Sequence, residues 1–250
     1  MILLIDAGNT RVKWRLVGAD ATSVHAEGAC AHDEIGLLGA QIESRLQAGS
    51  APQARMVGII GTNVAGAAVA ERIAALACPW GLTPEWLTPQ ASCAGIINGY
   101  DNPAQLGADR WAALIGARQL HAGDCLVVSA GTATTVDLLS ADGRFEGGLI
   151  LPGVDLMQRA LAGGTAQLPL ADGRFALAPR CTADAIRSGC LQAQAGAVER
   201  MFRQIAARPA PLCLLTGGAA EAFAQLLDLP LRQVDNLVLL GLQAIVRSRH

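Results

Sequence analysis

The sequence predicts an α/β fold built from two similar halves. An apolar run that breaks at a glycine occurs twice, at 3–10 and 126–132, about half the chain length apart. After each break, apolar or β-branched residues return at alternating positions, which is typical of a strand. Each half later contains a second strand, a short polar turn and an alanine-rich helix, at 56–77 and 212–227. Because strands alternate with helices at this spacing, we expect two α/β domains with largely parallel sheets.

The two halves are joined by a short connection. Residues 118–124 contain no extended stretch rich in Gly, Ser or Pro, so we predict closely packed domains at 1–118 and 119–250. Asp33 and Thr182 are expected to cap helices, because their side-chain oxygens can accept hydrogen bonds from the first helical N–H groups. Helices are expected at 34–47, 108–120, 154–162, 183–206 and 235–248.

Composition and charge exclude several classes of function. Hydrophobic residues make up 52% of the 250-residue chain, charged residues 16%, and the net charge is -2. A buried core is therefore expected, and a nucleic-acid partner is not. The apolar start at 1–5 is too short for a signal or membrane segment, so we expect a soluble, cytoplasmic protein with no membrane partner. The seven cysteines form no C-x-x-C pair, which favours small buried thiols in a reducing compartment.

The first glycine turn is a candidate phosphate site. In Asp6-Ala-Gly8-Asn9-Thr10, Gly8 lets a phosphate approach the backbone, and Asn9 and Thr10 add neutral donors. Asp6 could hold Mg²⁺ or its waters, since hard cations prefer carboxylate oxygen. Lys13 lies beyond the turn and could reach a terminal phosphate. The alternative is an ordinary β-turn with a solvated aspartate.

A second glycine turn repeats this pattern with hydroxyl groups. Residues 130–135 place three threonines around Gly131, although a simple threonine-rich strand has the same composition. Two such loops facing each other across a cleft would hold a polyphosphate from both sides. The turn 216–218 could accommodate the adenine and ribose of a nucleotide, or could only begin a helix. Walker A, G-x-G-x-x-G and G-x-S-x-G patterns do not occur, which disfavours P-loop and Rossmann sites and nucleophile-elbow hydrolases.

The segment 99–110 is the most distinctive candidate for binding an acceptor. Its polar, turn-forming residues lead into a helix expected near Ala108, which places Asp109 and Arg110 in the first helical turn. The helix dipole favours an ionised carboxylate there, and such a modest base suits phosphoryl transfer. Arg110 offers a planar fork for a substrate carboxylate. The alternative is a surface Asp–Arg pair that only caps a helix.

These motifs, in this order, resemble those of the type III pantothenate kinases. The resemblance runs from residue 3 to about 218 and implies a duplicated actin/hexokinase-like (RNase H-like) fold with two domains flanking a nucleotide cleft. The segments that carry it are Asp6-x-Gly8-Asn9-Thr10, Tyr100-x-Asn102-Pro103, Gly107-Ala108-Asp109-Arg110, Gly131-Thr132-Ala133-x-Thr135-x-Asp137, Gly147-Gly148-x-Ile150-x-Pro152-Gly153 and Thr182-x-x-Ala185-Ile186-x-x-Gly189.

The resemblance also implies an activity and a set of site residues. The activity is ATP-dependent phosphorylation of pantothenate to 4'-phosphopantothenate, the first step of coenzyme A synthesis, with Mg²⁺ and a monovalent cation, K⁺ or NH₄⁺. Asp109 would be the catalytic base, and Thr182 would contact pantothenate across a homodimer interface, giving a shared active site. The residues implied in ATP binding are Asp6, Gly8, Asn9, Thr10, Lys13 and Thr132. Those implied in pantothenate binding are Tyr100, Gly107, Ala108, Asp109, Arg110 and Thr182.

One residue departs from the family pattern. Members usually carry aspartate at the position held here by Ser129, where it helps to hold the monovalent cation. Serine offers one neutral oxygen, so we expect a site that is weakened or rebuilt from water and neighbours.

Two alternative functions remain open. The first is a kinase of the same fold for another small acceptor, a sugar or short carboxylate, which Tyr100 and Gly107–Arg110 argue against. The second is a non-catalytic regulatory or accessory protein. Ser129 alone favours this second alternative, and the presence of Asp6 and Asp109 opposes it.

Overall fold

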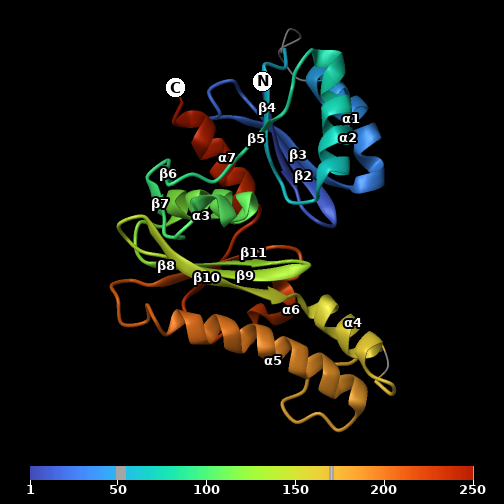
Figure 1. The fold of residues 1–250 in the computed structure, drawn as a ribbon, viewed down its shortest axis with the longest axis vertical. Helices are drawn as coiled ribbons and strands as arrows, with labels where there is room; N and C mark the ends of the chain where they lie inside the picture. Colours follow the sequence, from blue (N-terminus) through green and yellow to red (C-terminus); the bar gives the residue numbers. More distant parts are fainter. Residues whose placement is uncertain (49–54, 169, 171, 250) are drawn as a thin grey trace. The chain divides into compact units, whose positions relative to one another are not determined.

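The chain folds into two compact units in the computed structural model, which describes residues 1–48, 55–168, 170 and 172–249. One unit comprises Met1–Leu120 together with Leu237–His250, and the other comprises His121–Asn236 (Figure 1). The α/β class is as expected. The sequence, however, had placed everything after residue 118 in the second half, whereas the structure returns the last helix to the first unit.

The first unit is built on a five-stranded sheet with the order β3-β2-β1-β4-β5. β1, β2 and β3 pair antiparallel in succession, whereas β4 runs parallel to β1 and β5 runs parallel to β4. The expectation of a largely parallel sheet was therefore wrong, because strands joined by tight turns pair antiparallel. The strands are β1 (Ile2–Ala7), β2 (Arg11–Val17), β3 (Val24–Ala31), β4 (Gly58–Asn63) and β5 (Glu85–Trp86).

Helices cover both faces of this sheet (Figure 1). α1 (Ile35–Ala48) and α2 (Ala67–Ala77) pack on the face that carries Leu3 and Ile5 of β1. α3 (Ala108–Leu120) and α7 (Leu237–Arg247) contribute to the core on the face that carries Ile2 and Leu4. The unit also contains the short elements η1 (His32–Glu34), η2 (Cys78–Trp80), β6 (Ser92–Cys93), β7 (Ile96–Asn98) and η3 (Pro103–Gln105).

The last helix joins the first unit through close contact with α3. A Cβ added to Gly116 of α3 would overlap the backbone oxygen of Leu237, and one added to Gly241 of α7 would overlap that of Ala112. Only glycine at these two positions allows the helix backbones to approach so closely. The two glycines therefore fix the place of α7 in the fold.

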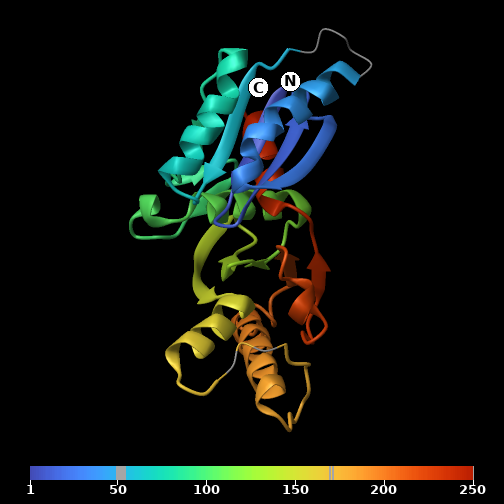
Figure 2. The ribbon, with the colours of Figure 1, turned by 90° about the vertical axis from the view of Figure 1, so that its right-hand side faces the viewer.

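The second unit repeats the strand arrangement of the first, with the order β12-β11-β8-β9-β10. β8, β9 and β10 pair antiparallel, and β11 runs parallel to both β8 and β12. One face packs on α5 and α6, and α4 lies beside α5 (Figure 2). The elements are β8 (Cys125–Ala130), β9 (Ala133–Leu139), β10 (Arg144–Pro152), α4 (Val154–Gly164), α5 (Thr182–Phe202), β11 (Leu212–Thr216), α6 (Glu221–Ala224) and β12 (Leu231–Gln233).

Several local expectations were wrong. Thr182 is the first residue of α5 rather than its cap, and the cap residue Cys181 makes no side-chain capping bond to the backbone N–H groups of the first turn. Asp33 lies inside η1, so α1 begins only at Ile35. Two cysteines, Cys78 and Cys181, are exposed rather than buried.

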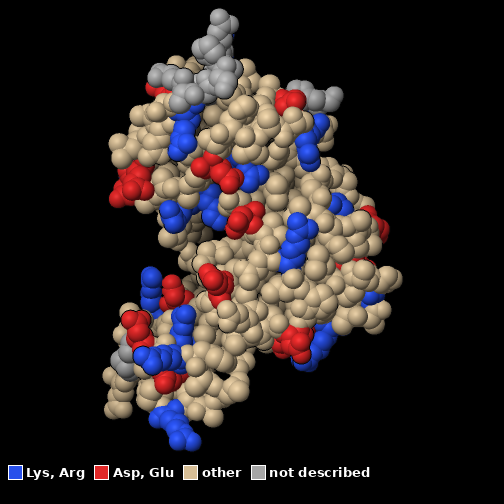
Figure 3. Space-filling view, turned by 180° about the vertical axis from the view of Figure 1, so that it is seen from behind, with Lys and Arg blue, Asp and Glu red and all other residues tan. Residues whose placement is uncertain are grey.

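The surface and the helices bear on possible partners. On the face shown in Figure 3, basic and acidic side chains are interspersed, which is unlike the one-sided basic surface typical of nucleic-acid binding. Among the described residues, no helix combines the length and the apolar character needed to cross a bilayer.

Candidate functional site

Asp6 stands at the centre of a row of polar side chains on the first sheet. Its register partners are Lys13 on β2 and Thr62 on β4, and register partners on adjacent strands share one face of a sheet. The fully buried Thr62 hydroxyl donates a hydrogen bond to Asp6 Oδ1 at 2.9 Å. Sequence reasoning missed Thr62, because it lies 56 residues from Asp6 and belongs to none of the motifs.

The surroundings of Asp6 disfavour its ionised form. Burial raises the pKa of the Asp6 carboxyl, while the Thr62 hydrogen bond and the positive charge of Lys13 offset part of this effect. The negative charge of Asp109 raises the pKa further. The structure therefore brings together the predicted metal-binding carboxylate and the predicted base, which come from segments about a hundred residues apart.

Two neighbouring carboxylates with one lysine suit a divalent cation. The described residues contain no group of three or more His, Cys, Asp or Glu side chains placed to hold a metal. Mg²⁺ is commonly bound by only one or two carboxylates together with waters and substrate phosphates. The donor set around Asp6 therefore fits Mg²⁺ that arrives with a nucleotide, and does not resemble a closed protein cage.

The turn after Asp6, predicted as a phosphate loop, is closed by a backbone hydrogen bond. The Gly8 N–H donates to the Arg11 carbonyl at 3.1 Å, which closes the turn between β1 and β2. Asn9 and Thr10 are exposed at its tip. The Gly8 carbonyl is hydrogen-bonded to His32 Nε2 at 2.8 Å, a contact that sequence reasoning did not predict.

The acceptor segment folds as expected at the start of α3. Arg110 is buried, with 4% of its surface exposed, and its Nη1 donates to the Tyr100 hydroxyl at 2.9 Å. The Arg110 guanidinium also lies over the Tyr100 ring, 5.6 Å from its centroid. A Cβ on Gly107 would lie 2.6 Å from Asp109 Oδ1, so the glycine makes room for that carboxylate. Ala108 begins the helix, and the predicted substrate residues from Tyr100 to Arg110 form one contiguous site.

In the second unit a row of hydroxyls occupies the place of the Asp6 row. Ser129 on β8 is in register with Thr135 on β9 and Thr216 on β11, which puts three hydroxyl side chains on one face. Thr135 Oγ1 and Thr216 Oγ1 are buried and have no hydrogen-bond partner among the described residues. Buried polar atoms are normally satisfied, so two such hydroxyls beside Ser129 indicate a place for a ligand.

The second glycine turn is held by backbone contacts from two directions. The Gly153 N–H donates to the Thr132 carbonyl at 2.9 Å, and the Ala219 N–H donates to the Ala130 carbonyl at 3.1 Å. A Cβ on Gly153 would lie 2.7 Å from the Thr132 carbonyl oxygen and would overlap that of Gly131. The second glycine loop and the turn at 216–218 therefore form one assembly.

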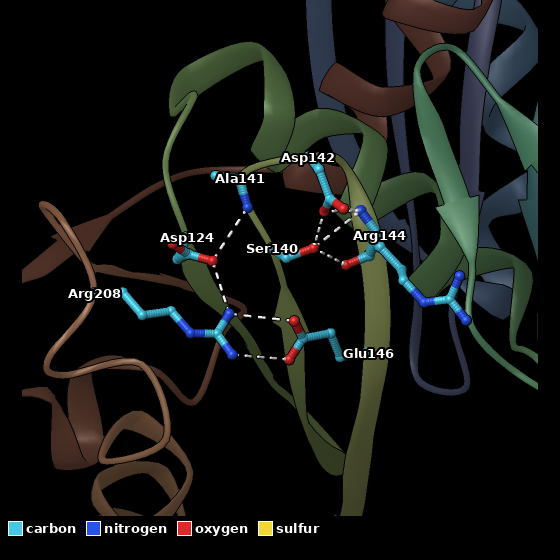
Figure 4. A network of polar contacts seen from close by, with 7 residues as sticks. All are labelled: Asp124, Ser140, Ala141, Asp142, Arg144, Glu146 and Arg208. Carbon is cyan, nitrogen blue, oxygen red and sulfur yellow. Dashed lines mark hydrogen bonds and ion pairs between the residues drawn. The ribbon is translucent and has the colours of Figure 1, made fainter.

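A paired polar network marks the opposite end of the same strands (Figure 4). Arg208 Nη1 donates to Asp124 Oδ1 at 2.8 Å and to Glu146 Oε1 at 3.2 Å. Asp124 Oδ1 also accepts from the Ala141 N–H at 3.2 Å, and the Ser140 hydroxyl donates to Asp142. These groups satisfy one another and hold the β9–β10 turn. The candidate site therefore lies at the glycine-loop end, where hydroxyls are left unpaired.

Thr182 belongs to a different unit from the other predicted pantothenate-binding residues. It is exposed at the start of α5 in the second unit, whereas Tyr100 and Gly107–Arg110 belong to the first unit. Its predicted role depends on a second copy of the chain. Exposed apolar side chains occur in the same unit, at Leu149, Ile150, Leu170, Phe175 and Leu177.

Comparisons with known proteins show which family the chain resembles. A family model described as type III pantothenate kinase matches residues 2–204. A protein of that name from Aromatoleum aromaticum is 58% identical over 99% of this chain and 98% of its own length. Another, from Azoarcus sp. strain BH72, is 55% identical over 99% of this chain and 91% of its own.

Similar solved structures show the fold alone. The activator of 2-hydroxyisocaproyl-CoA dehydratase from Clostridium difficile, with bound ADPNP, has a TM-score of 0.57 at 11% identity, covering 99% of this chain and 93% of its own. A PilM–PilN type IV pilus biogenesis complex gives a TM-score of 0.57 at 14% identity, covering 98% of each chain. The likeness confirms the duplicated actin/hexokinase-like fold.

Proposed function

Since this chain belongs to the type III pantothenate kinase family, we propose that its Asp6–Asp109 site transfers the γ-phosphate of ATP in line to the terminal hydroxyl of pantothenate. The chain is a phosphotransferase that acts in the first step of coenzyme A synthesis. The observation that carries the assignment of the site is the polar row on β1, β2 and β4, in which the buried Thr62 hydroxyl donates to Asp6 Oδ1 at 2.9 Å and Lys13 is the register partner of Asp6.

Asp109 serves as the base that accepts the hydroxyl proton. It lies in the first turn of α3. Phosphoryl transfer depends on positioning and charge neutralisation more than on strong basicity, so such a base is sufficient. Gly107 leaves the room that the carboxylate needs.

Arg110 binds the carboxylate of pantothenate. Its guanidinium is buried against Tyr100, whose hydroxyl takes one of the N–H donors. A guanidinium presents a planar fork of N–H donors that matches the geometry of a carboxylate. Tyr100 thereby fixes the orientation of Arg110, and Ala108 contributes backbone at the start of the helix.

Asp6 and the two glycine loops bind ATP. Mg²⁺ bound with the nucleotide would neutralise charge on the phosphates, and Asp6 is the carboxylate placed to hold it or its waters. Gly8, Asn9 and Thr10 present the first turn to the phosphates, and Lys13 adds a positive charge in the Asp6 row. Thr132 belongs to the second turn, which presents its own backbone and hydroxyl.

The hydroxyl row of the second unit holds the monovalent cation. K⁺ and NH₄⁺ are both accommodated by neutral oxygen atoms, as potassium is by backbone carbonyls in channels. Ser129 offers one such oxygen, and the unpaired Thr135 and Thr216 hydroxyls offer two more. The site is thus rebuilt without the aspartate that relatives of this type usually carry.

The active enzyme is a cytoplasmic homodimer. Seven exposed apolar side chains of the second unit, Leu149, Ile150, Leu156, Leu161, Leu170, Phe175 and Leu177, could be covered by a second copy, and removing apolar surface from water favours association. Thr182, exposed at the start of α5, would then reach the pantothenate of the partner. Light scattering of the active protein checks this, and a fully active monomer would contradict it.

A coupled ADP-release assay tests the function. Purified protein is supplied with Mg²⁺-ATP and, separately, pantothenate, sugars and acetate, with and without potassium. We expect ADP release above background with pantothenate only, and stimulation by potassium. Release with a different acceptor would establish the alternative kinase, and nucleotide binding without release with any acceptor would favour a regulatory protein.

A further inference from the structure

His32 makes a contact with the first phosphate loop that no motif accounts for. Its Nε2 lies 2.8 Å from the Gly8 carbonyl oxygen. A carbonyl oxygen can only accept a hydrogen bond, so Nε2 must carry the proton in this contact. The imidazole is therefore a donor to the backbone of the turn.

The contact fixes the direction of the next backbone amide. A peptide group is planar and trans, so the Gly8 C=O and the Asn9 N–H point in opposite directions. When His32 holds the Gly8 carbonyl, the Asn9 N–H must point away from His32. Asn9 is exposed at the tip of the turn, so an oxyanion bound there could accept a hydrogen bond from its N–H.

His32 is itself anchored to a second element. Its backbone carbonyl accepts a hydrogen bond from Arg72 Nη1 of α2 at 2.9 Å. Residue 32 directly follows β3, which pairs along β2 up to Arg11. The backbone of His32 is thus attached both to the sheet and to α2. This attachment helps to hold its imidazole beside Gly8.

We propose that His32 is a positioning residue for ATP, which aims the Asn9 N–H at the phosphates by holding the Gly8 carbonyl. The inference rests on the proposed role of this loop in phosphate binding. Without the imidazole, the Gly8–Asn9 peptide can rotate and the amide loses its fixed direction. The consequence is weaker binding of the phosphate part of the nucleotide, with binding of the nucleoside part and of the acceptor unchanged.

The test compares His32→Phe, which keeps the ring but removes the donor, with His32→Gln, which restores an N–H at similar reach. Dissociation constants for ADP and for adenosine are measured by calorimetry, and KM values for ATP and pantothenate by ADP release. We expect His32→Phe to weaken ADP binding and raise the KM for ATP about 3- to 10-fold, the range equivalent to one hydrogen bond. Adenosine binding and the KM for pantothenate should not change, and His32→Gln should stay within about twofold of wild type.

His25→Phe is the matched control. His25 lies on β3, where its Nε2 is hydrogen-bonded to the exposed Ser23 hydroxyl at 3.1 Å, so its loss should leave all four constants unchanged. Three results would overturn the inference. His32→Phe could lose ADP and adenosine binding equally, or it could bind ADP as tightly as the wild type. His32→Gln could also fail to restore ADP binding. His32→Ala replaces the phenylalanine variant if that does not fold.

The binding measurements separate this inference from the proposed function. If the wild type binds ADP but phosphorylates no pantothenate, the proposed function is wrong, while the comparison of ADP with adenosine still decides the role of His32. If the wild type gains no affinity from the phosphates of ADP relative to adenosine, the loop is not a phosphate site and the inference is wrong.

Discussion

The two glycine loops share a backbone plan but differ in the charge that they carry. The central residue is Asp6 in the first unit and Ser129 in the second, each flanked by register partners on two neighbouring strands. The rows are Lys13–Asp6–Thr62 and Thr135–Ser129–Thr216. The duplicated fold thus supplies two equivalent positions, and the register row is charged in the first and neutral in the second.

The surrounding backbone confirms that the two positions correspond. The Ala7 carbonyl accepts from the Val64 N–H at 3.0 Å, and the Ala130 carbonyl accepts from the Ala219 N–H at 3.1 Å. The loops are held differently, however. A side chain, His32, holds the first loop, and the backbone of Gly153 holds the second. Equivalent backbones can therefore be stabilised by unrelated residues.

The largest expected effect is on the turnover of a variant in the first unit, which carries the charged groups. Asp109→Asn should lower kcat by roughly 10²–10⁴, the usual contribution of a positioned base. Binding of ADP should change little, because the substitution is nearly isosteric and lies on the acceptor side. Asp101→Asn, at an exposed aspartate of the same segment, is the control and should keep wild-type kcat. A kcat above half of the wild-type value in Asp109→Asn would limit Asp109 to a structural role.

The next effect concerns the contact that holds the second loop. In Gly153→Ala the new Cβ would lie 2.7 Å from the Thr132 carbonyl oxygen, so the loop must shift. Displacement of a binding group by about 1 Å can cost up to about 10²-fold, and we expect kcat/KM for ATP to fall about 10- to 100-fold. Gly164→Ala is the control, because an added Cβ there has nothing within 4 Å, and it should keep the wild-type kcat/KM for ATP. Unchanged ATP kinetics in Gly153→Ala would remove the second loop from the ATP site.

The sequence predicted the parts of this site that depend on local patterns. The strands at the two glycine turns follow from alternating apolar residues, and α3 begins at Ala108 as expected. The helix caps at Asp33 and Thr182 were wrong, because capping depends on the backbone geometry of one or two residues. Thr62 was missed because its bond to Asp6 joins residues 56 positions apart, and α7 was misplaced because its packing depends on two distant glycines, Gly116 and Gly241.

A smaller effect, on potassium dependence, is expected when a carboxylate is introduced at Ser129 in the neutral row of the second unit. Ser129→Asp should lower the half-saturating potassium concentration by roughly fivefold, since a carboxylate about 4 Å from a cation contributes about 1 kcal/mol even in water. In sodium-only buffer the variant should be slower than wild type, because an uncompensated carboxylate would repel phosphate. Potassium titrations at fixed Mg²⁺-ATP decide the matter. Superimposable curves would show that Ser129 does not govern the cation site.

The smallest expected effect is on the stability of the ligand-free protein. Burial and Asp109 raise the pKa of Asp6 in the folded state, so the ionised carboxylate destabilises the fold at pH values above its ordinary pKa of about 3.9. Asp6→Asn should therefore have a higher Tm than wild type at pH 7, and the difference should shrink as the pH falls toward 4 and both states bind the proton. A lower Tm at pH 7 would contradict this account of Asp6.

We expect the two equivalent positions to have different roles, with Asp6 required for turnover and Ser129 not required for magnesium use. The most direct measurement is the rate of pantothenate-dependent ADP release across a Mg²⁺ titration for Asp6→Asn and Ser129→Asn, the same new side chain at each position. An amide is a poorer ligand than a carboxylate for a hard cation. We expect Asp6→Asn to lose most of its turnover and to need more Mg²⁺, and Ser129→Asn to keep wild-type magnesium dependence. Equal losses in the two variants, or a greater loss in Ser129→Asn, would contradict the claim.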